Sequence, residues 1–141
     1  KVNNYSISHT SYKIINEKNN VIGFRQARTF KNLNELLKSC DIGLSTVILK
    51  KKILRKNIKF PDLKTKEDFV LWLKILNSGN TIYALDENLT IWTKTNNSLS
   101  SSIFQKLKDG YRLYNHYMKS NFIKSLIYTF ILSVKFVLKN L

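Results

Sequence analysis

The apolar pattern begins with two segments rich in β-branched and aromatic residues, 5–15 and 21–30. The residues between them are polar and include Asn19-Asn20, which tolerates a positive φ. This arrangement predicts a β-hairpin. Leu33 to Ser39 should follow as a short helix, because its leucines recur at helical spacing. Asn32 and Glu35 stand at the spacing of a capping box at its start.

The middle of the chain carries a strong helix signal after a basic stretch. Residues 45–49 fit either a buried strand or the start of a helix, and their periodicity does not decide between the two. Residues 50–66 hold eight basic residues and the only proline, so we expect mostly loop. Thr65 is a good N-cap for the next helix, with Asp68 three residues on and an apolar face of Phe69, Trp72, Leu73 and Leu76.

The C-terminal part alternates short strands and helices. Two short strands are predicted at 81–85 and 89–92, separated by three polar residues. A polar loop should run from Lys94 to Ser102. A helix over about 102–119 is then indicated by apolar positions that recur at helical spacing.

The last segment, 121–141, is apolar but interrupted by lysines. Its longest uncharged run has ten residues, about half of the roughly 20 that a spanning helix needs. On a helical wheel one narrow sector holds Asn121, Lys124, Tyr128, Lys135 and Lys139. This pattern is typical of a helix lying in a membrane interface. Packing on the domain or on a partner is the alternative, and we take 1–120 and 121–141 as separate units.

The charge of the chain is strongly positive. It has 141 residues, which suits one domain, and its 24 Lys and Arg against nine Asp and Glu give a net charge of +15. Such a charge favours a polyanionic partner, namely nucleic acid, an anionic membrane surface or a phosphorylated substrate. The alternative is that the positive charge reflects a coding bias toward lysine, in which case the lysines form a solvated surface that binds no ligand. With one cysteine and two histidines, we do not expect a structural zinc site of the usual ligand set.

One pair of acidic residues stands out as candidate chemistry. Glu67 and Asp68 lie at a predicted helix N-terminus among lysines, where an ionised carboxylate is favoured. Such a carboxylate can accept a proton from an attacking hydroxyl. The alternative is that Asp68 only caps its helix. His9 and His116 are isolated in the sequence, and no Gly-rich phosphate loop or zinc-protease motif is present.

Three runs carry a resemblance to a known family. They are SCDIGLSTVILKKKIL (39–54), FPDLKTKEDFVLWLKIL (60–76) and LTIWTKTNNSLSSS (89–102). In this order they resemble the second half of bacterial family-2 glycosyltransferases, which build surface polysaccharides. Those enzymes have a GT-A fold with a nucleotide-sugar half first and an acceptor half second. The resemblance therefore implies an α/β, partial GT-A-like fold plus a C-terminal amphipathic helix.

The resemblance also implies roles for particular residues. Asp68 matches the catalytic base of an inverting transfer, and Glu67 is its neighbour in the acceptor site. Substrate-binding candidates are Ser45, Thr46, Trp72 and Lys94. Lys94 stands near the position where the family commonly has an arginine after an aromatic residue, and it could serve there as a point charge.

The family's metal-binding D-x-D motif does not occur in the sequence. Because the chain starts at Lys1 in strand-like sequence, we expect it to be part of a longer enzyme. The donor site and a divalent metal, Mg or Mn, should then depend on residues upstream, and the chain alone should not catalyse transfer.

The resemblance implies a set of partners and a location. It implies a nucleotide-sugar donor and a saccharide or lipid-linked acceptor. It also implies that the enzyme lies at the cytoplasmic face of the membrane, where it contacts an anionic lipid surface, and that nucleic acid is not a partner. A small basic nucleic-acid-binding module and a catalytically inactive fragment are the alternatives.

Overall fold

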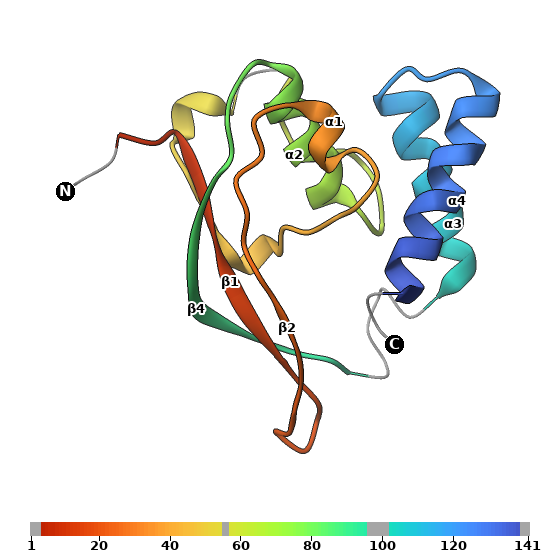
Figure 1. The fold of residues 1–141 in the computed structure, drawn as a ribbon. Coiled ribbons are helices and arrows are strands. Elements are labelled where there is room, and N and C mark those ends of the chain that lie inside the picture. The colour runs from red at the N-terminus through yellow and green to blue at the C-terminus, as the bar shows by residue number, and fades with distance from the viewer. Residues whose placement is uncertain (1–3, 55–56, 96–101, 139–141) are drawn as a thin grey trace.

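The computed structural model describes residues 4–54, 57–95 and 102–138. A small sheet lies to one side of helix α2, and the paired helices α3 and α4 lie to the other side (Figure 1). The strands are β1 (Ile7–Ile15), β2 (Val21–Arg25), β3 (Val47–Leu49) and β4 (Tyr83–Thr93). The α-helices are α1 (Leu33–Leu36), α2 (Glu67–Asn77), α3 (Ile103–Arg112) and α4 (Phe122–Leu138). This mixed α/β architecture is consistent with part of a GT-A-like fold, as predicted.

Strand β1 is the centre of the four-stranded sheet. It pairs antiparallel with β2 through its C-terminal half and antiparallel with β3 through its N-terminal half. It pairs in parallel with β4 along most of its length. The predicted hairpin is confirmed, with Asn19 at a φ of 62° in its turn, although the second strand ends at Arg25 rather than near residue 30.

The two strands expected at 81–85 and 89–92 are one strand, β4. Its register on β1 shifts in the middle, where Thr10 pairs with Leu85 but Ser11 pairs with Asn88. The intervening Asp86 accepts hydrogen bonds from Ser11 Oγ and from Gln26 Nε2, each 2.6 Å long. The polar residues therefore form an irregularity inside a continuous strand, because their side chains find partners on β1 and beside β2.

The other local predictions have mixed outcomes. The helix after the hairpin is confirmed but shorter, and the Asn32 side chain accepts from the Glu35 N–H as a capping box requires. For residues 45–49 both the helical and the strand alternative occur, one after the other: a 3-10 turn covers Leu44–Thr46, and strand β3 follows it. The helix expected over about 102–119 comprises α3 and a π-helical segment, Leu113–Tyr117.

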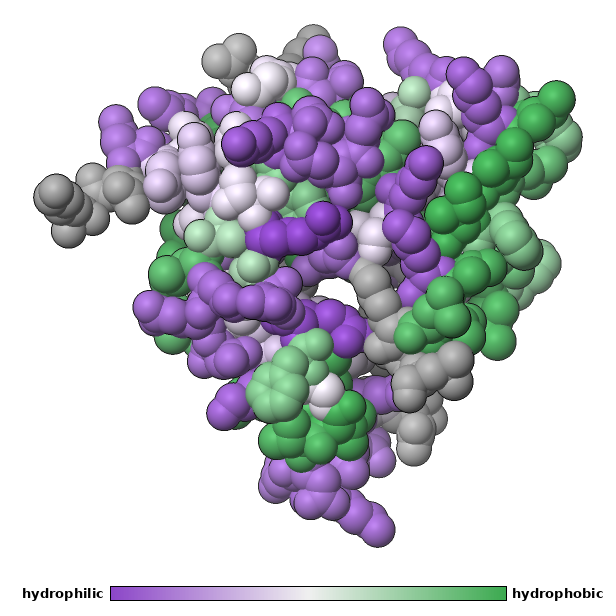
Figure 2. All heavy atoms as spheres, viewed as in Figure 1, coloured by the Kyte–Doolittle hydropathy of each residue, from purple (hydrophilic) through white to green (hydrophobic). Residues whose placement is uncertain are grey.

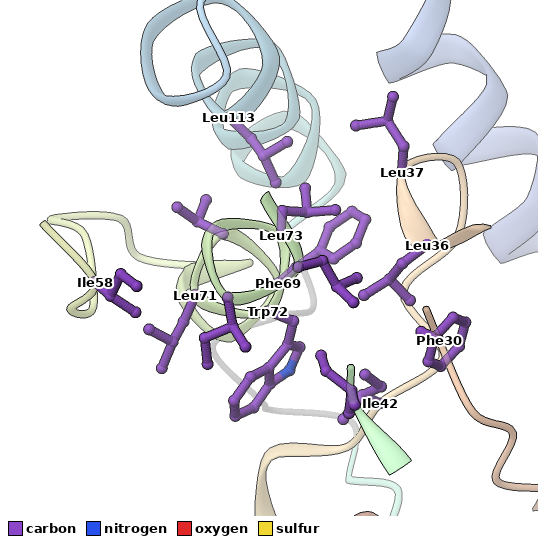
Figure 3. Packing of buried hydrophobic residues seen from close by; sticks show 14 of the residues in the cluster. Phe30, Leu36, Leu37, Ile42, Ile58, Phe69, Leu71, Trp72, Leu73 and Leu113 are labelled. Atoms are coloured by element: carbon purple, nitrogen blue, oxygen red, sulfur yellow. The ribbon is translucent and has the colours of Figure 1, made fainter. Parts of the chain in front are cut away.

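Helix α2 forms the middle of the hydrophobic core. Seven of its eleven residues are buried: Phe69, Val70, Leu71, Trp72, Leu73, Ile75 and Leu76. They pack against Phe30 and Leu36 on one side and Leu113 on another (Figure 3). A helix that is apolar on nearly all sides must be enclosed by other elements. The sheet and α3 therefore fix the position of α2 together.

The start of α2 differs from the prediction. The N-cap is Lys66, in the left-handed conformation with a φ of 65°, and its side chain makes no capping hydrogen bond. The predicted cap, Thr65, instead donates its backbone N–H and its hydroxyl to Asp109 Oδ2 on α3, over 2.9 and 3.0 Å. A buried carboxylate offers Thr65 two hydrogen bonds, so tertiary contact outweighs the local capping preference.

The predicted C-terminal helix is confirmed over Phe122–Leu138, and Lys139 lies outside the described residues. Its Ser125, Thr129 and Leu132 are buried, and a Cβ at Gly110 of α3 would lie 3.2 Å from Thr129 Cγ2. Helix α4 therefore docks on α3, while the proposed division of the chain at residue 120 stays a prediction. No helix in the described part of the chain is both long and apolar enough to cross a membrane.

Candidate functional site

Asp68 lies in the first turn of α2, as predicted, and its side chain is half-buried. Its Oδ1 accepts a 2.7 Å hydrogen bond from the Phe69 N–H. Burial raises the pKa of Asp68 to about 6, against the opposing effects of that hydrogen bond and of the Lys66 charge. The neighbouring Glu67 adds to the increase. A carboxyl with a pKa near 6 is ionised at neutral pH yet basic enough to take a proton.

Three further titratable groups interact electrostatically with Asp68 or with one another, and with Asp68 they form what we call the Asp68 cluster: Tyr12, Cys40, Lys66 and Asp68. Burial raises the pKa of Tyr12; the Arg25 charge opposes this increase, whereas Cys40 and Asp68 add to it. Burial lowers the pKa of Lys66, and interactions with Cys40, Asp68 and Asp109 oppose that decrease. Side chains of β1, of the segment after α1 and of the start of α2 therefore influence one another electrostatically. Pattern analysis missed Tyr12, Cys40 and Lys66, because only the tertiary fold brings them to Asp68.

The predicted acceptor segment lies beside this cluster. A Cβ at Gly43 would lie 3.2 Å from Tyr12 Cε1 and 3.5 Å from Thr46 Cγ2, so the Tyr12 ring lies against the turn that contains Ser45 and Thr46. Thr46 is buried and donates its hydroxyl to the Gly43 carbonyl at 2.7 Å, whereas Ser45 is exposed. Ser45 is thus the more accessible of the two predicted residues, and the substrate role of both stays a prediction.

Lysines from three elements lie close to the cluster. The pKa of Lys106 on α3 is lowered by burial and then by the charges of Lys66 and Lys94. Lys94 follows β4, where its N–H donates to the Ile15 carbonyl at 2.8 Å and its side chain is exposed. Lys94 and Lys106 therefore add positive potential on the side of the cluster where Lys66 lies, which suits a phosphorylated ligand. The sequence indicated Lys94 through the family resemblance but gave no signal for Lys106.

Trp72 requires a correction. It is only 1% exposed and lies in the hydrophobic core (Figure 3), and its Nε1 has no hydrogen-bond partner among the described residues. Trp72 is four residues after Asp68 on α2, and its side chain points into the core because α2 is buried on nearly all sides. The indole offers no surface to an acceptor sugar, so burial argues against the predicted contact with substrate.

The T-x-E-D start of α2, with its apolar face on the other side, predicts that the Asp68 carboxylate faces an open cleft, and this stays a prediction. Two shallow depressions of about 270 Å³ are described on the surface, and Asp68 lines neither. One is bordered by Ser11, Arg25 and Asp86, and the other by Tyr5, Asn80 and Tyr83. No group of three His, Cys, Asp or Glu residues in the described ranges could hold a metal ion. The divalent metal was expected to depend on residues upstream of this chain, and it stays a prediction.

The relatives that sequence comparison finds here are all named as glycosyltransferases. This similarity supports a glycosyltransferase family. No family model matches the chain. No solved structure matches it either.

Two relatives come from Escherichia coli and one from Bacillus subtilis. The chain is 37% identical over 108 residues to WfgD, the UDP-Glc:alpha-D-GlcNAc-diphosphoundecaprenol beta-1,3-glucosyltransferase of Escherichia coli, covering 75% of this chain and 41% of WfgD. WfaP, an Escherichia coli protein with the same activity in its name, is 42% identical over 78 residues, 54% of this chain and 30% of WfaP. TuaG of Bacillus subtilis, named for teichuronic acid biosynthesis, is 29% identical over 65% of this chain and 36% of TuaG. The chain thus spans less than half the length of these relatives.

Proposed function

We propose that this chain is the acceptor-side part of an inverting family-2 glycosyltransferase with Asp68 as its general base. The enzyme would transfer a sugar from a nucleotide-sugar to a saccharide on a lipid-linked acceptor during surface polysaccharide synthesis, at the cytoplasmic face of the membrane. The observation that carries this proposal is Asp68 itself, a half-buried carboxyl with a pKa of about 6. Support comes from the names of WfgD and WfaP, which specify a UDP-sugar donor and a diphosphoundecaprenol-linked acceptor.

The proposed reaction needs one proton acceptor and one leaving group. Asp68 takes the proton of an acceptor hydroxyl as that oxygen forms a bond to the anomeric carbon of the donor sugar. The bond from the anomeric carbon to the diphosphate breaks on the opposite side, and the nucleoside diphosphate leaves with the electron pair. A single displacement of this kind inverts the anomeric configuration. The described residues of this chain supply no metal ligand set, so no step is assigned to a metal here.

The Asp68 cluster suits this role in two ways. The Lys66, Lys94 and Lys106 charges can attract the diphosphate of donor or acceptor. Tyr12 and Ser45 border the region where an acceptor hydroxyl would approach. Because Asp68 is fixed by its hydrogen bond from Phe69 in the first turn of a core helix, its position does not need to be organised during the reaction.

The test is a transfer assay with the full-length protein that contains this chain. UDP-glucose and a GlcNAc-diphospho-lipid should give a disaccharide-diphospho-lipid of inverted configuration, detected by mass spectrometry and by NMR of the new linkage. The 141-residue chain alone should give none, because transfer needs the donor aligned with the acceptor. A product of retained configuration, or full activity in the 141-residue chain, would contradict the proposal.

The rate should depend on pH through the Asp68 carboxyl. Below a pH of about 6 the base becomes protonated, so kcat/KM should fall about tenfold per pH unit and level off above 7. The profile is measured at one fixed, moderate ionic strength, so that screening of the lysine contacts is the same at every pH. A flat profile between pH 5 and pH 8 would exclude Asp68 as the group that sets the rate.

A further inference from the structure

Helix α4 has its apolar side chains on the outside. The face docked on α3 carries two hydroxyls, from Ser125 and Thr129, which donate within their own helix to the carbonyls of Asn121 and Ser125. The outer side carries exposed large apolar residues: Phe122, Ile123, Leu126, Ile127, Phe130, Val134, Val137 and Leu138. The sequence predicted an apolar face, but its direction away from the domain comes from the structure. In a helix pair exposed to water, the apolar side chains would lie between the helices and the polar ones outside.

The closest described approach of α3 and α4 is at small residues, while Tyr111 and Phe122 meet edge to face at the start of α4, with ring centroids 6.0 Å apart. A Cβ at Gly110 would lie 3.2 Å from Thr129 Cγ2, so the two backbones approach closely there. Small residues between helices, with large apolar residues outside, are characteristic of helices that pack in lipid. At its first turns α3 adds Ile103, Phe104 and Leu107, all exposed. Hydrophobic side chains accordingly run along the outer side of α4 (Figure 2).

The charges beside this face select the partner. No acidic residue follows Asp109 in the sequence. Lys119, Lys124 and Lys135 are exposed, and the last two lie three helical turns apart on one side of α4. Each basic residue near an anionic bilayer adds favourable electrostatic energy. An apolar face bordered only by cations fits an anionic lipid surface better than a protein surface of mixed charge.

We propose that the outer face of the α3–α4 pair inserts into the interface of an anionic bilayer, with Phe104 and Phe130 among acyl chains and Lys124 and Lys135 at headgroups. Lys124 and Lys135 lie on one side of α4, and a helix in the plane of the membrane keeps both of them at the headgroups. Helix α4 would therefore lie in that plane. The link to the proposed function is that this surface would hold the Asp68 cluster near a lipid-linked acceptor.

Vesicle flotation of the 141-residue chain tests the proposal without any need for transfer activity, so either proposal can fail alone. Phosphatidylcholine vesicles with and without phosphatidylglycerol serve as probes. The unaltered chain should float with the anionic vesicles and less so as salt is added. Phe130→Glu, at a side chain that is 70% exposed, should reduce partitioning at least tenfold. The matched control is Ile48→Glu on β3, where the side chain is 77% exposed and the change in charge is identical.

Three outcomes would overturn the proposal. They are absence of flotation by the unaltered chain, equal flotation by the Phe130→Glu and Ile48→Glu variants, and a dimer that Phe130→Glu dissociates while no chain floats. The third would assign the face to a second copy. Thermal melting by circular dichroism verifies that both variants fold, which is expected because both side chains are exposed.

Discussion

Asp68→Asn should abolish most transfer and at the same time stabilise the fold. In the full-length enzyme an amide cannot take the proton of the acceptor hydroxyl, so kcat should fall by about 10²–10⁴-fold. Asparagine keeps the oxygen that accepts from the Phe69 N–H, so the first turn of α2 should stay intact. Glu67→Gln is the matched control, because it removes the adjacent charge and leaves the base, and it should cost far less activity.

The stability gain follows from the sign of the pKa shift. The folded-state pKa of Asp68 is raised from 3.8 to about 6, so the native state binds more protons than the unfolded state between these values. The free energy of unfolding therefore decreases as the pH rises from about 4 to 6. Removing the carboxylate should restore about 3 kcal/mol at pH 7 and nothing at pH 3.

Urea unfolding of the 141-residue chain at both pH values measures this difference. An unchanged midpoint at pH 7 would mean that the carboxylate is well solvated. In that case the raised basicity assigned to Asp68 would be lost along with the stability gain. A full transfer rate for the asparagine variant would show that another group removes the proton.

Local signals explain which parts of the fold the sequence could predict. The hairpin depends on alternation and on a turn residue, Asn19, that adopts a positive φ, and α2 depends on a dense apolar face next to an acidic start. Both signals lie within a dozen residues. The catalytic candidate Asp68 was found because it belongs to such a local motif, and the family resemblance gave it a role.

Long-range partners explain what the sequence could not predict. Thr65 has the composition of an N-cap, yet it pairs with Asp109, 44 residues away. Tyr12 lies on β1 and reaches Asp68 only because β1 and α2 enclose the same region. The parallel pairing of β1 with β4 likewise follows from the crossover through α2 and has no signature in either strand. Residues joined by such contacts have no common spacing that a pattern could reveal.

The second large effect is expected at the buried acid of α3. Asp109 is fully buried, and its Oδ2 accepts from the Thr65 N–H, from the Thr65 hydroxyl and from Gln105 Nε2, over 2.9, 3.0 and 2.9 Å. Arg112 Nη1 lies 3.9 Å from Oδ1. Asp109→Ala leaves the buried Thr65 N–H without an acceptor and separates α3 from the start of α2. It should lower the free energy of unfolding by about 3–5 kcal/mol.

The pH dependence at Asp109 has the opposite sign to that at Asp68. Burial raises its pKa, but the hydrogen bonds from Gln105 and Thr65 and the Arg112 charge outweigh burial and hold the pKa below its usual value. The stability from Asp109 is therefore present above the unfolded pKa of about 3.9 and is lost as the pH falls through the lower folded value. Asp109→Ala should thus cost most near neutral pH and least in strong acid.

Urea unfolding of the 141-residue chain at pH 7 and pH 3 separates this contact from a general loss of charge. The control is Asp62→Ala, which removes the same group from an exposed loop position and should change the free energy of unfolding by less than about 0.5 kcal/mol. Asp109→Asn should fall between the two, since it keeps an oxygen acceptor for Thr65 but loses the attraction to Arg112. Equal midpoints for Asp109→Ala and Asp62→Ala would mean that α3 does not hold the start of α2 through this carboxylate.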